Sequence, residues 1–180
     1  GKSRVFAVSL KGPAAVLGGG RAADAAYWIE HRSGAWITSS YYKQALPEWV
    51  QQFNQGRRAE KYWNREWKDS AGKTLRTTSQ EAAARFFDIV GSTPFATDYQ
   101  FEFVRELITQ EKVGSGPATD LLIVSLSATD ILGHEVGPDS PQAAAMLLAL
   151  DRQLAEFFGF LARQFGLANV WLALSSDHGI

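Results

Sequence analysis

The chain has 180 residues, of which 46% are hydrophobic, 21% charged and 12% aromatic. This length suffices for one domain with a core that buries roughly 70% of the unfolded chain's surface. The formal net charge of −1 argues against a broad basic surface for nucleic acid, and no apolar run approaches the ~20 residues of a membrane span. The absence of cysteine excludes disulfides and thiolate metal ligands.

The first half of the chain alternates short apolar segments with turn residues. Residues 4–10 are β-branched and aromatic, which predicts a buried strand. The glycines 18–20 lack the spacing of a phosphate-binding loop, so we interpret them as a flexible turn. The patterns that follow predict a hairpin at 26–42, a helix at 46–54, a polar loop at 55–80 anchored by Trp63 and Trp67, and a short helix at 82–90.

The second half predicts two long helices and two strands. Helical spacing of apolar residues indicates amphipathic helices at 98–111 and 142–165. Near-continuous apolar runs indicate strands at 120–127 and 170–176. Because fully apolar strands that alternate with helices are typical of a sheet covered on both faces, we expect an α/β fold with a mostly parallel sheet sandwiched by helices.

Two acid–histidine pairs follow the predicted strands of the second half. Asp130 and His134 come after the strand at 120–127, and Asp177 and His178 come after the strand at 170–176. Carboxylate oxygens and imidazole nitrogens are ligands that suit Zn²⁺. Either pair alone is more often a turn cap and a surface histidine, but two pairs at neighbouring strand ends of one sheet favour a two-metal site.

The lysine that follows the first predicted strand has two possible roles. Lys11 is either a solvated loop residue or, at the carboxyl edge of the sheet, a contact for an anionic substrate, and its position leaves both open. His31, in the aromatic hairpin, is expected on the surface or stacked on a ring. We expect the hairpin's aromatic residues to belong to the core.

The segment around Asp130 resembles a known family. Residues 127–140 read SATDILGHEVGPDS and residues 175–179 read SSDHG. These segments are similar to the S-x-x-D-x-x-G-H-x-x-G-P-x-S and [ST]-S-D-H-G motifs of the alkaline phosphatase superfamily, especially its type I phosphodiesterase/nucleotide pyrophosphatase group and the bacterial phosphate-irrepressible alkaline phosphatases. Residues 4–11, 26–42 and 46–50 are also similar to this group.

The resemblance implies a phosphate-ester hydrolase with two zinc ions. Asp130 and His134 match the pair that holds one ion, and Asp177 and His178 match ligands of the other. The implied nucleophile, a threonine or serine that forms a phospho-enzyme, would lie upstream of Gly1, so no catalytic nucleophile is expected in this chain. Since further ligands are also missing, we expect an internal fragment that is inactive alone.

The resemblance also divides the chain into three expected parts of one alkaline-phosphatase-like domain. Residues 1–25 would form a core strand and loop, residues 26–100 an inserted, aromatic-rich, cap-like segment, and residues 101–180 the core that carries both metal motifs. Family members are commonly exported, so the resemblance implies a periplasmic or secreted protein that acts on small phosphate mono- or diesters.

One departure from the family motif bears on the substrate. Phosphatase members carry an S-L-K-D-R-like run after this strand, whereas this chain reads Ser9-Leu10-Lys11-Gly12-Pro13. Lys11 matches the substrate-binding lysine, but Pro13 stands in place of the arginine and cannot make a bidentate phosphate contact. The departure leaves open a diesterase or a weak monoesterase. The alternatives are a non-catalytic binding module of the same fold, or a sulfatase or phosphomutase relative.

Overall fold

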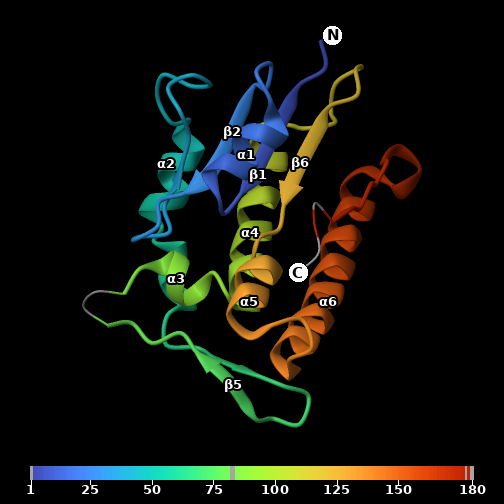
Figure 1. Cartoon of the computed structure of the whole chain (residues 1–180). Coiled ribbons are helices and arrows are strands. Elements are labelled where there is room, and N and C mark those ends of the chain that lie inside the picture. The colour runs from blue at the N-terminus through green and yellow to red at the C-terminus, as the bar shows by residue number, and fades with distance from the viewer. Residues whose placement is uncertain (1, 82–83, 177, 179–180) are drawn as a thin grey trace.

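A four-stranded sheet lies at the centre of the molecule, in a computed structural model that describes residues 2–81, 84–176 and 178 (Figure 1). The strand order is β3-β2-β1-β6. Strand β1 (Val5–Ser9) pairs in parallel with β2 (Ala25–Ile29) and with β6 (Leu121–Ser125), while the short β3 (Trp36–Ile37) runs antiparallel to β2. The predicted α/β class with a mostly parallel sheet is thus confirmed.

One face of the sheet carries small side chains that let helix α1 (Gly12–Gly19) approach closely. Ala7 and Ala26 of the sheet pack against Ala15 of the helix. A Cβ added at Gly18 would lie 3.0 Å from the Cγ2 of Ile123, so the glycine leaves room for the strand. The flexible turn predicted at 18–20 is wrong for Gly18 and Gly19, because this close packing and a proline in the first turn stabilise a helix.

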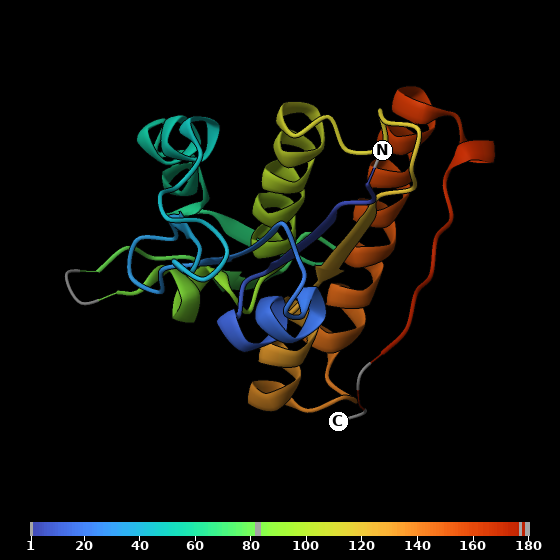
Figure 2. The same cartoon turned by 90° about the horizontal axis from the view of Figure 1, so that it is seen from above.

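The opposite face carries large side chains and packs against helix α4 (Pro94–Gln110) (Figure 2). Phe103 is fully buried, with its ring 4.1 Å from that of Trp36, and Tyr27 and Trp36 of the predicted hairpin join the core. The prediction that the hairpin's aromatic residues belong to the core is wrong for Tyr41, which is 63% exposed. Gln100 donates to the carbonyl oxygens of Val8 and Ser125 at 3.2 and 2.9 Å. The helix is thereby fixed to both strands that end near Lys11 and Asp130. It begins at Pro94, four residues before the predicted start, because proline suits the first helical turn.

Helices α5 (Ala128–Val136) and α6 (Pro141–Phe165) follow β6. Ser140 caps α6 by accepting a hydrogen bond from the amide of Ala143 at 3.0 Å. The helix α6 packs against α4 and α5, with Met146 and Phe157 buried. The long helix predicted at 142–165 is confirmed within one residue at its start.

The region predicted as a polar loop at 55–80 contains regular structure instead. A two-stranded hairpin, β4 (Glu66–Lys68) with β5 (Thr74–Thr77), forms outside the central sheet. Its strands are short and mostly exposed, so they carry little of the apolar alternation that reveals a strand in sequence. The remaining elements are α2 (Glu48–Gln55), η1 (Arg58–Tyr62), α3 (Phe86–Val90) and η2 (Leu167–Asn169).

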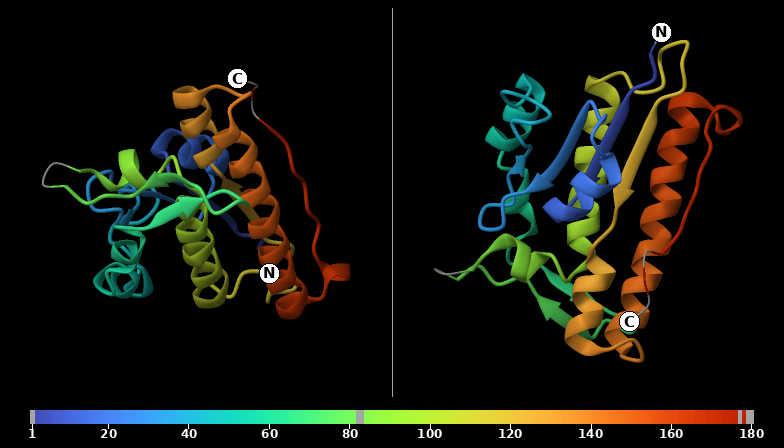
Figure 3. Two further views of the ribbon diagram at one scale, coloured as in Figure 1. Left: turned by 90° about the horizontal axis from the view of Figure 1, so that it is seen from below. Right: turned by 45° about the horizontal axis from the view of Figure 1, so that its top comes forward.

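The strand predicted at 170–176 is absent from the described chain. These residues run as extended chain alongside α6 (Figures 2 and 3), and the Trp171 side chain is 98% exposed. An apolar, β-branched run favours a strand, but a strand forms only where a neighbouring chain supplies its hydrogen bonds. The end of this segment nevertheless returns to the vicinity of α5.

The three-part division of the domain stays a prediction. Strand β3 and most of β2 lie inside the middle segment 26–100 and pair within the central sheet. No helix in the described part of the chain is long and apolar enough to cross a lipid bilayer.

Candidate functional site

The candidate site lies where β1 and β6 end side by side. The two strands pair in parallel with Ser9 opposite Ser125, so the residues that follow each strand leave the sheet at one edge. The hydroxyls of Ser9 and Ser127 lie 3.3 Å apart in a buried contact that joins the two exits. Ser9 Oγ also accepts from the amide of Lys11 at 3.2 Å. These contacts fix the start of both segments that carry predicted site residues.

The first acid–histidine pair lies on a helix. Asp130 and His134 both belong to the regular helix α5. Residues four apart lie on the same face of a helix, and His134 Nε2 is 3.1 Å from Asp130 Oδ1. Gly133 is buried on the helix instead of forming a turn. Helical periodicity therefore brings the two side chains together.

The other carboxylate oxygen of Asp130 contacts Lys11. The Lys11 ammonium donates a hydrogen bond to Asp130 Oδ2 across the ends of β1 and β6. This contact is the main cause that lowers the pKa of Asp130 below its ordinary value, with burial opposing it and His134 and His178 adding to it. Asp130 is therefore an anion at neutral pH, as a metal ligand must be.

The second acid–histidine pair is described only in part. His178 lies with its Nε2 atom 3.4 Å from Asp130 Oδ1, on the same oxygen that His134 contacts. Asp177 lies outside the described residues. The structure thus brings together Lys11, Asp130, His134 and His178, although the last arrives on an extended chain and not at a strand end.

The donor set around Asp130 fits a divalent cation in its chemistry. Asp130 Oδ1 is buried without a hydrogen-bond partner, while two imidazole nitrogens lie within 3.4 Å of it. Lys11 pairs with the other oxygen of Asp130, whereas a buried oxygen without a hydrogen bond, such as Oδ1, is costly and would gain from a cation. Within the described residues, however, no group of three or more histidine or acidic side chains is arranged to hold an ion. The residues present fit a pair of metal ligands and not a whole shell.

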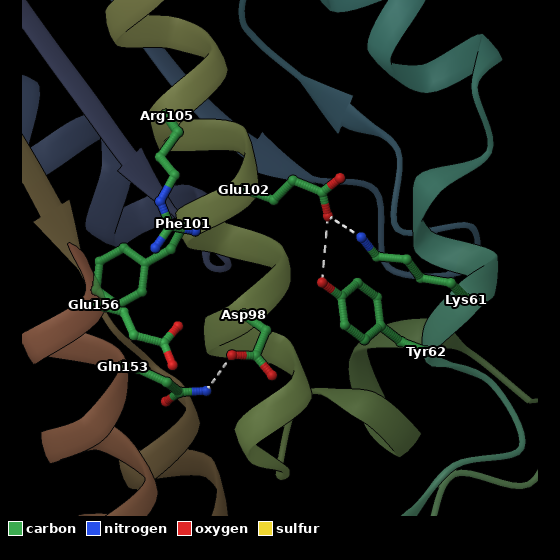
Figure 4. Close-up of a pocket in the computed structure, with 8 residues that line it drawn as sticks. All are labelled: Lys61, Tyr62, Asp98, Phe101, Glu102, Arg105, Gln153 and Glu156. Atoms are coloured by element: carbon green, nitrogen blue, oxygen red, sulfur yellow. Dashed lines mark hydrogen bonds and ion pairs between the residues drawn. The ribbon is translucent and has the colours of Figure 1, made fainter. Parts of the chain in front are cut away.

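Other features lie away from this site. His31 stacks on Phe87 with ring centres 4.2 Å apart, as expected for a surface or stacking residue. A cavity of about 200 Å³ opens between α4, α6 and η1, and Figure 4 shows two of its lining residues, Gln153 and Asp98, joined by a hydrogen bond of 2.6 Å. Burial raises the pKa of Asp98 there. None of the predicted site residues lines this cavity.

Two polar contacts near the site had no signal in the sequence. The hydroxyls of Ser9 and Ser127 pair at the strand ends, and Arg76 of the hairpin pairs with Glu135 of α5. Serine after a strand is common in any protein, and the partner of an arginine on a short exposed strand is set by tertiary structure. Such residues become recognisable only when the edge of the sheet is assembled.

A comparison with known protein families shows to which family the chain belongs. Residues 6–180 match the family model for type I phosphodiesterase / nucleotide pyrophosphatase, which spans nearly the whole sequence and both acid–histidine pairs. The chain belongs to this family.

Several known proteins match nearly all of the chain. Alkaline phosphatase PhoV from Synechococcus elongatus is 34% identical over 99% of the chain, which spans 36% of that relative. A protein from Myroides odoratus named calcium-transporting ATPase is 32% identical over 99% of the chain and 37% of its own length. The crystal structure of alkaline phosphatase PafA superposes with a TM-score of 0.78 and 28% identity, over 91% of this chain and 36% of that one. The chain spans little more than a third of each of these proteins.

Proposed function

We propose that this chain is part of a two-zinc phosphate-ester hydrolase and contributes half of each metal site. The proposal rests on one observation: Lys11, Asp130, His134 and His178 converge at one edge of the sheet in a member of the type I phosphodiesterase family. Together, a cation, a carboxylate and two imidazoles can bind both a metal ion and an anionic ester. Relatives named alkaline phosphatase support the same reaction class.

Each predicted ligand has a specific role in this proposal. Asp130 and His134 would hold one zinc ion, and Asp177 with His178 would contribute to the second. Bound zinc would supply Lewis-acid stabilisation of the negative charge that builds on the phosphoryl oxygens. His178, a proposed ligand of the second ion, contacts the same Asp130 oxygen as His134, a proposed ligand of the first ion. This shared contact supports two metal ions that lie close together.

Lys11 would bind the substrate. Its ammonium group is more than a third exposed and stands beside Asp130 at the carboxyl edge of the sheet. An ammonium is a compact positive charge that pairs well with a phosphoryl oxygen. If a metal ion binds Asp130 in place of Lys11, the lysine ammonium becomes free to bind an anion beside the ion.

The remaining parts of the site would come from the rest of the protein. We propose an upstream threonine or serine as the nucleophile, which displaces the leaving group at phosphorus and forms a phospho-enzyme that is then hydrolysed. Further metal ligands would lie both upstream and downstream of this chain. The fragment alone would therefore be inactive.

Pro13 bears on the choice between monoesters and diesters. It occupies the first turn of α1, where it supports the helix and has no donor to offer a phosphate. A doubly charged monoester gains most from an arginine contact, so its replacement favours a diester or slow monoester hydrolysis. The substrate would be a small phosphate ester, met in the periplasm or outside the cell.

The experiment uses the full-length protein loaded with zinc. We expect it to hydrolyse aryl phosphate diesters, and aryl phosphate monoesters more slowly, while Asp130→Asn loses at least about 100-fold in kcat/KM because a ligand is lost. Hydrolysis of neither ester class by the wild-type protein contradicts the proposal.

A second candidate function is a non-catalytic binding module of the same fold. The replacement of the family arginine by Pro13 is the observation that favours it. A full-length sequence without a threonine or serine at the nucleophile position, in a protein that binds zinc but turns over no ester, would support this module. A sulfatase or phosphomutase relative would be distinguished by turnover of aryl sulfates or by phosphoryl transfer within a sugar phosphate.

A further inference from the structure

The hairpin formed by β4 and β5 is joined to the helix that carries Asp130 and His134. We infer that Arg76, on β5, is a positioning residue that holds the C-terminal half of α5 in place through Glu135. The functional part of this inference rests on the proposed hydrolase activity. The structural part, that Arg76 restrains α5, stands on contacts within the described chain.

The Arg76 guanidinium spans two parts of the structure. Its Nη2 atom lies 2.6 Å from Glu135 Oε2, and its Nη1 donates to the hydroxyl of Ser92. Ser92 is fully buried at the corner between α3 and α4. The planar fork of an arginine can hold two partners in a fixed relation. Arg76 thereby ties α5 to a rigid part of the core.

The hairpin that carries Arg76 is itself well anchored. Thr78, directly after β5, is fully buried, and its hydroxyl donates to the carbonyl of Tyr62 at 2.6 Å and accepts from the amide of Arg65 at 2.9 Å. The amide of Asn64 donates to the Thr78 carbonyl at 2.7 Å. In Figures 1 and 3 the hairpin lies beside α5, at the end of the molecule toward which β6 points. Arg76 therefore projects from a fixed base.

The position of Glu135 on α5 links this contact to the site. It is the next residue after His134, whose Nε2 contacts Asp130. Ala128, Leu132 and Gly133 of α5 are buried, and Val136 is partly buried against the core. The last turn is therefore held by this packing and, through the exposed Glu135, by Arg76. A restraint on Glu135 therefore acts on the turn of helix that orients the His134 imidazole.

The energetics favour a role in positioning over one in stability. Arg76 is 27% and Glu135 41% exposed, and ion pairs this exposed contribute little to the free energy of unfolding. Small displacements of a catalytic group nevertheless cost large factors in rate. Loss of Arg76 should thus change the mobility of α5 and the turnover more than the melting temperature.

The first experiment needs no enzymatic activity. Hydrogen exchange of residues 128–137 is compared between wild type, Arg76→Ala and, as a matched control, Arg85→Ala. This control removes an exposed arginine that directly precedes α3 and pairs with Asp88 of that helix. We expect amides at the C-terminal end of α5 to exchange at least about fivefold faster in Arg76→Ala only, because local opening controls their rate. Unchanged exchange in Arg76→Ala overturns the inference. If that variant fails to fold, Arg76→Lys, which keeps the charge but not the fork, is measured against the same criterion.

The second experiment uses the full-length protein with zinc bound. We expect Arg76→Ala to lower kcat about tenfold with KM changed less than twofold, and the reversed pair Arg76→Glu with Glu135→Arg to recover most of the loss. A normal kcat, or no recovery in the reversed pair, overturns the role in catalysis. A different result is also informative: the wild-type protein shows no esterase activity, but α5 exchanges faster in Arg76→Ala. That result contradicts the proposed function and still supports the restraint on α5.

Discussion

The ammonium group of Lys11 contacts the Oδ2 atom of Asp130, although 119 positions separate the two residues in the chain. The parallel pairing of β1 with β6 makes this contact, because it places the ends of both strands at one edge. Lys11 thus serves as the counter-ion of Asp130 within the described chain. The proposed substrate-binding lysine and the proposed metal-binding aspartate therefore form an ion pair in this structure.

Removal of Lys11 should make stability depend less on pH. Because the lysine lowers the pKa of Asp130, its stabilisation is full above the ordinary aspartate pKa and is lost as pH falls through the lowered value. We expect Lys11→Met to cost less than about 1 kcal/mol at neutral pH, since the lysine is 37% exposed. Urea unfolding at about pH 7, about pH 5 and about pH 3 measures the difference, which should shrink only toward the acid end. The exposed Lys73→Met serves as control, and a loss that is equal at all three pH values contradicts the assignment.

Two glycines with similar positive φ angles should respond differently to alanine. Gly34 and Gly72 have φ angles of +74° and +83°, but a Cβ at Gly34 would lie 2.8 Å from Phe86 Cγ, whereas none of the described atoms lies within 4 Å at Gly72. Gly72→Ala should cost about 1–2 kcal/mol for the left-handed backbone, and Gly34→Ala about 1–3 kcal/mol more from overpacking. Urea unfolding measures both, and equal costs would show that Phe86 relaxes freely.

Asp120 should stabilise the start of β1 and β6. Its carboxylate accepts from the amide and guanidinium of Arg4 at 2.9 and 2.7 Å and from the amide of Gly114 at 2.9 Å. Burial alone would raise its pKa, but these hydrogen bonds outweigh it and leave the pKa below the ordinary value. We expect Asp120→Asn to cost about 1–3 kcal/mol near neutral pH, because it leaves donors unsatisfied. The cost should fall as pH drops through the lowered pKa, and the exposed Asp151→Asn should cost almost nothing in the same thermal unfolding assay.

The histidines should each account for one metal ion in the full-length protein. Because His134 and His178 are proposed ligands of different zinc ions, His134→Ala and His178→Ala should each lower the zinc content from about two ions to about one per chain. His31→Ala is the control, since His31 stacks on Phe87 outside the site. Elemental analysis of the purified protein measures the content, and circular dichroism checks that the fold survives. Two ions retained in both histidine variants would refute the ligand assignment.

Elements marked by a continuous apolar run or by strong helical periodicity were predicted well from the sequence. The strands at 4–10 and 120–127 and the helix at 142–165 match β1, β6 and α6, since each shows its burial pattern over five residues or more. Predictions failed where the pattern is short or weak. The β4–β5 hairpin has few buried positions, and α1 lies in a stretch of glycine and alanine that resembles a turn.

The extended segment 170–176 shows that strand propensity alone does not predict a strand. Its sequence favours a strand, yet in the described chain it pairs with no strand and leaves Trp171 almost fully exposed. Hydrogen bonding between strands depends on a partner that is distant in sequence, so local composition does not decide it.

The sequence by itself determined the family and the chemical identity of the candidate site, because both are carried by side chains spaced a few residues apart, as in Asp130 and His134. Only the tertiary structure decided that Lys11 and His178 reach the same aspartate, and that Arg76 holds the helix beside them. Those relationships depend on strand order and on the packing of helices across the sheet. They join residues that have no regular spacing in the chain, so no local pattern encodes them.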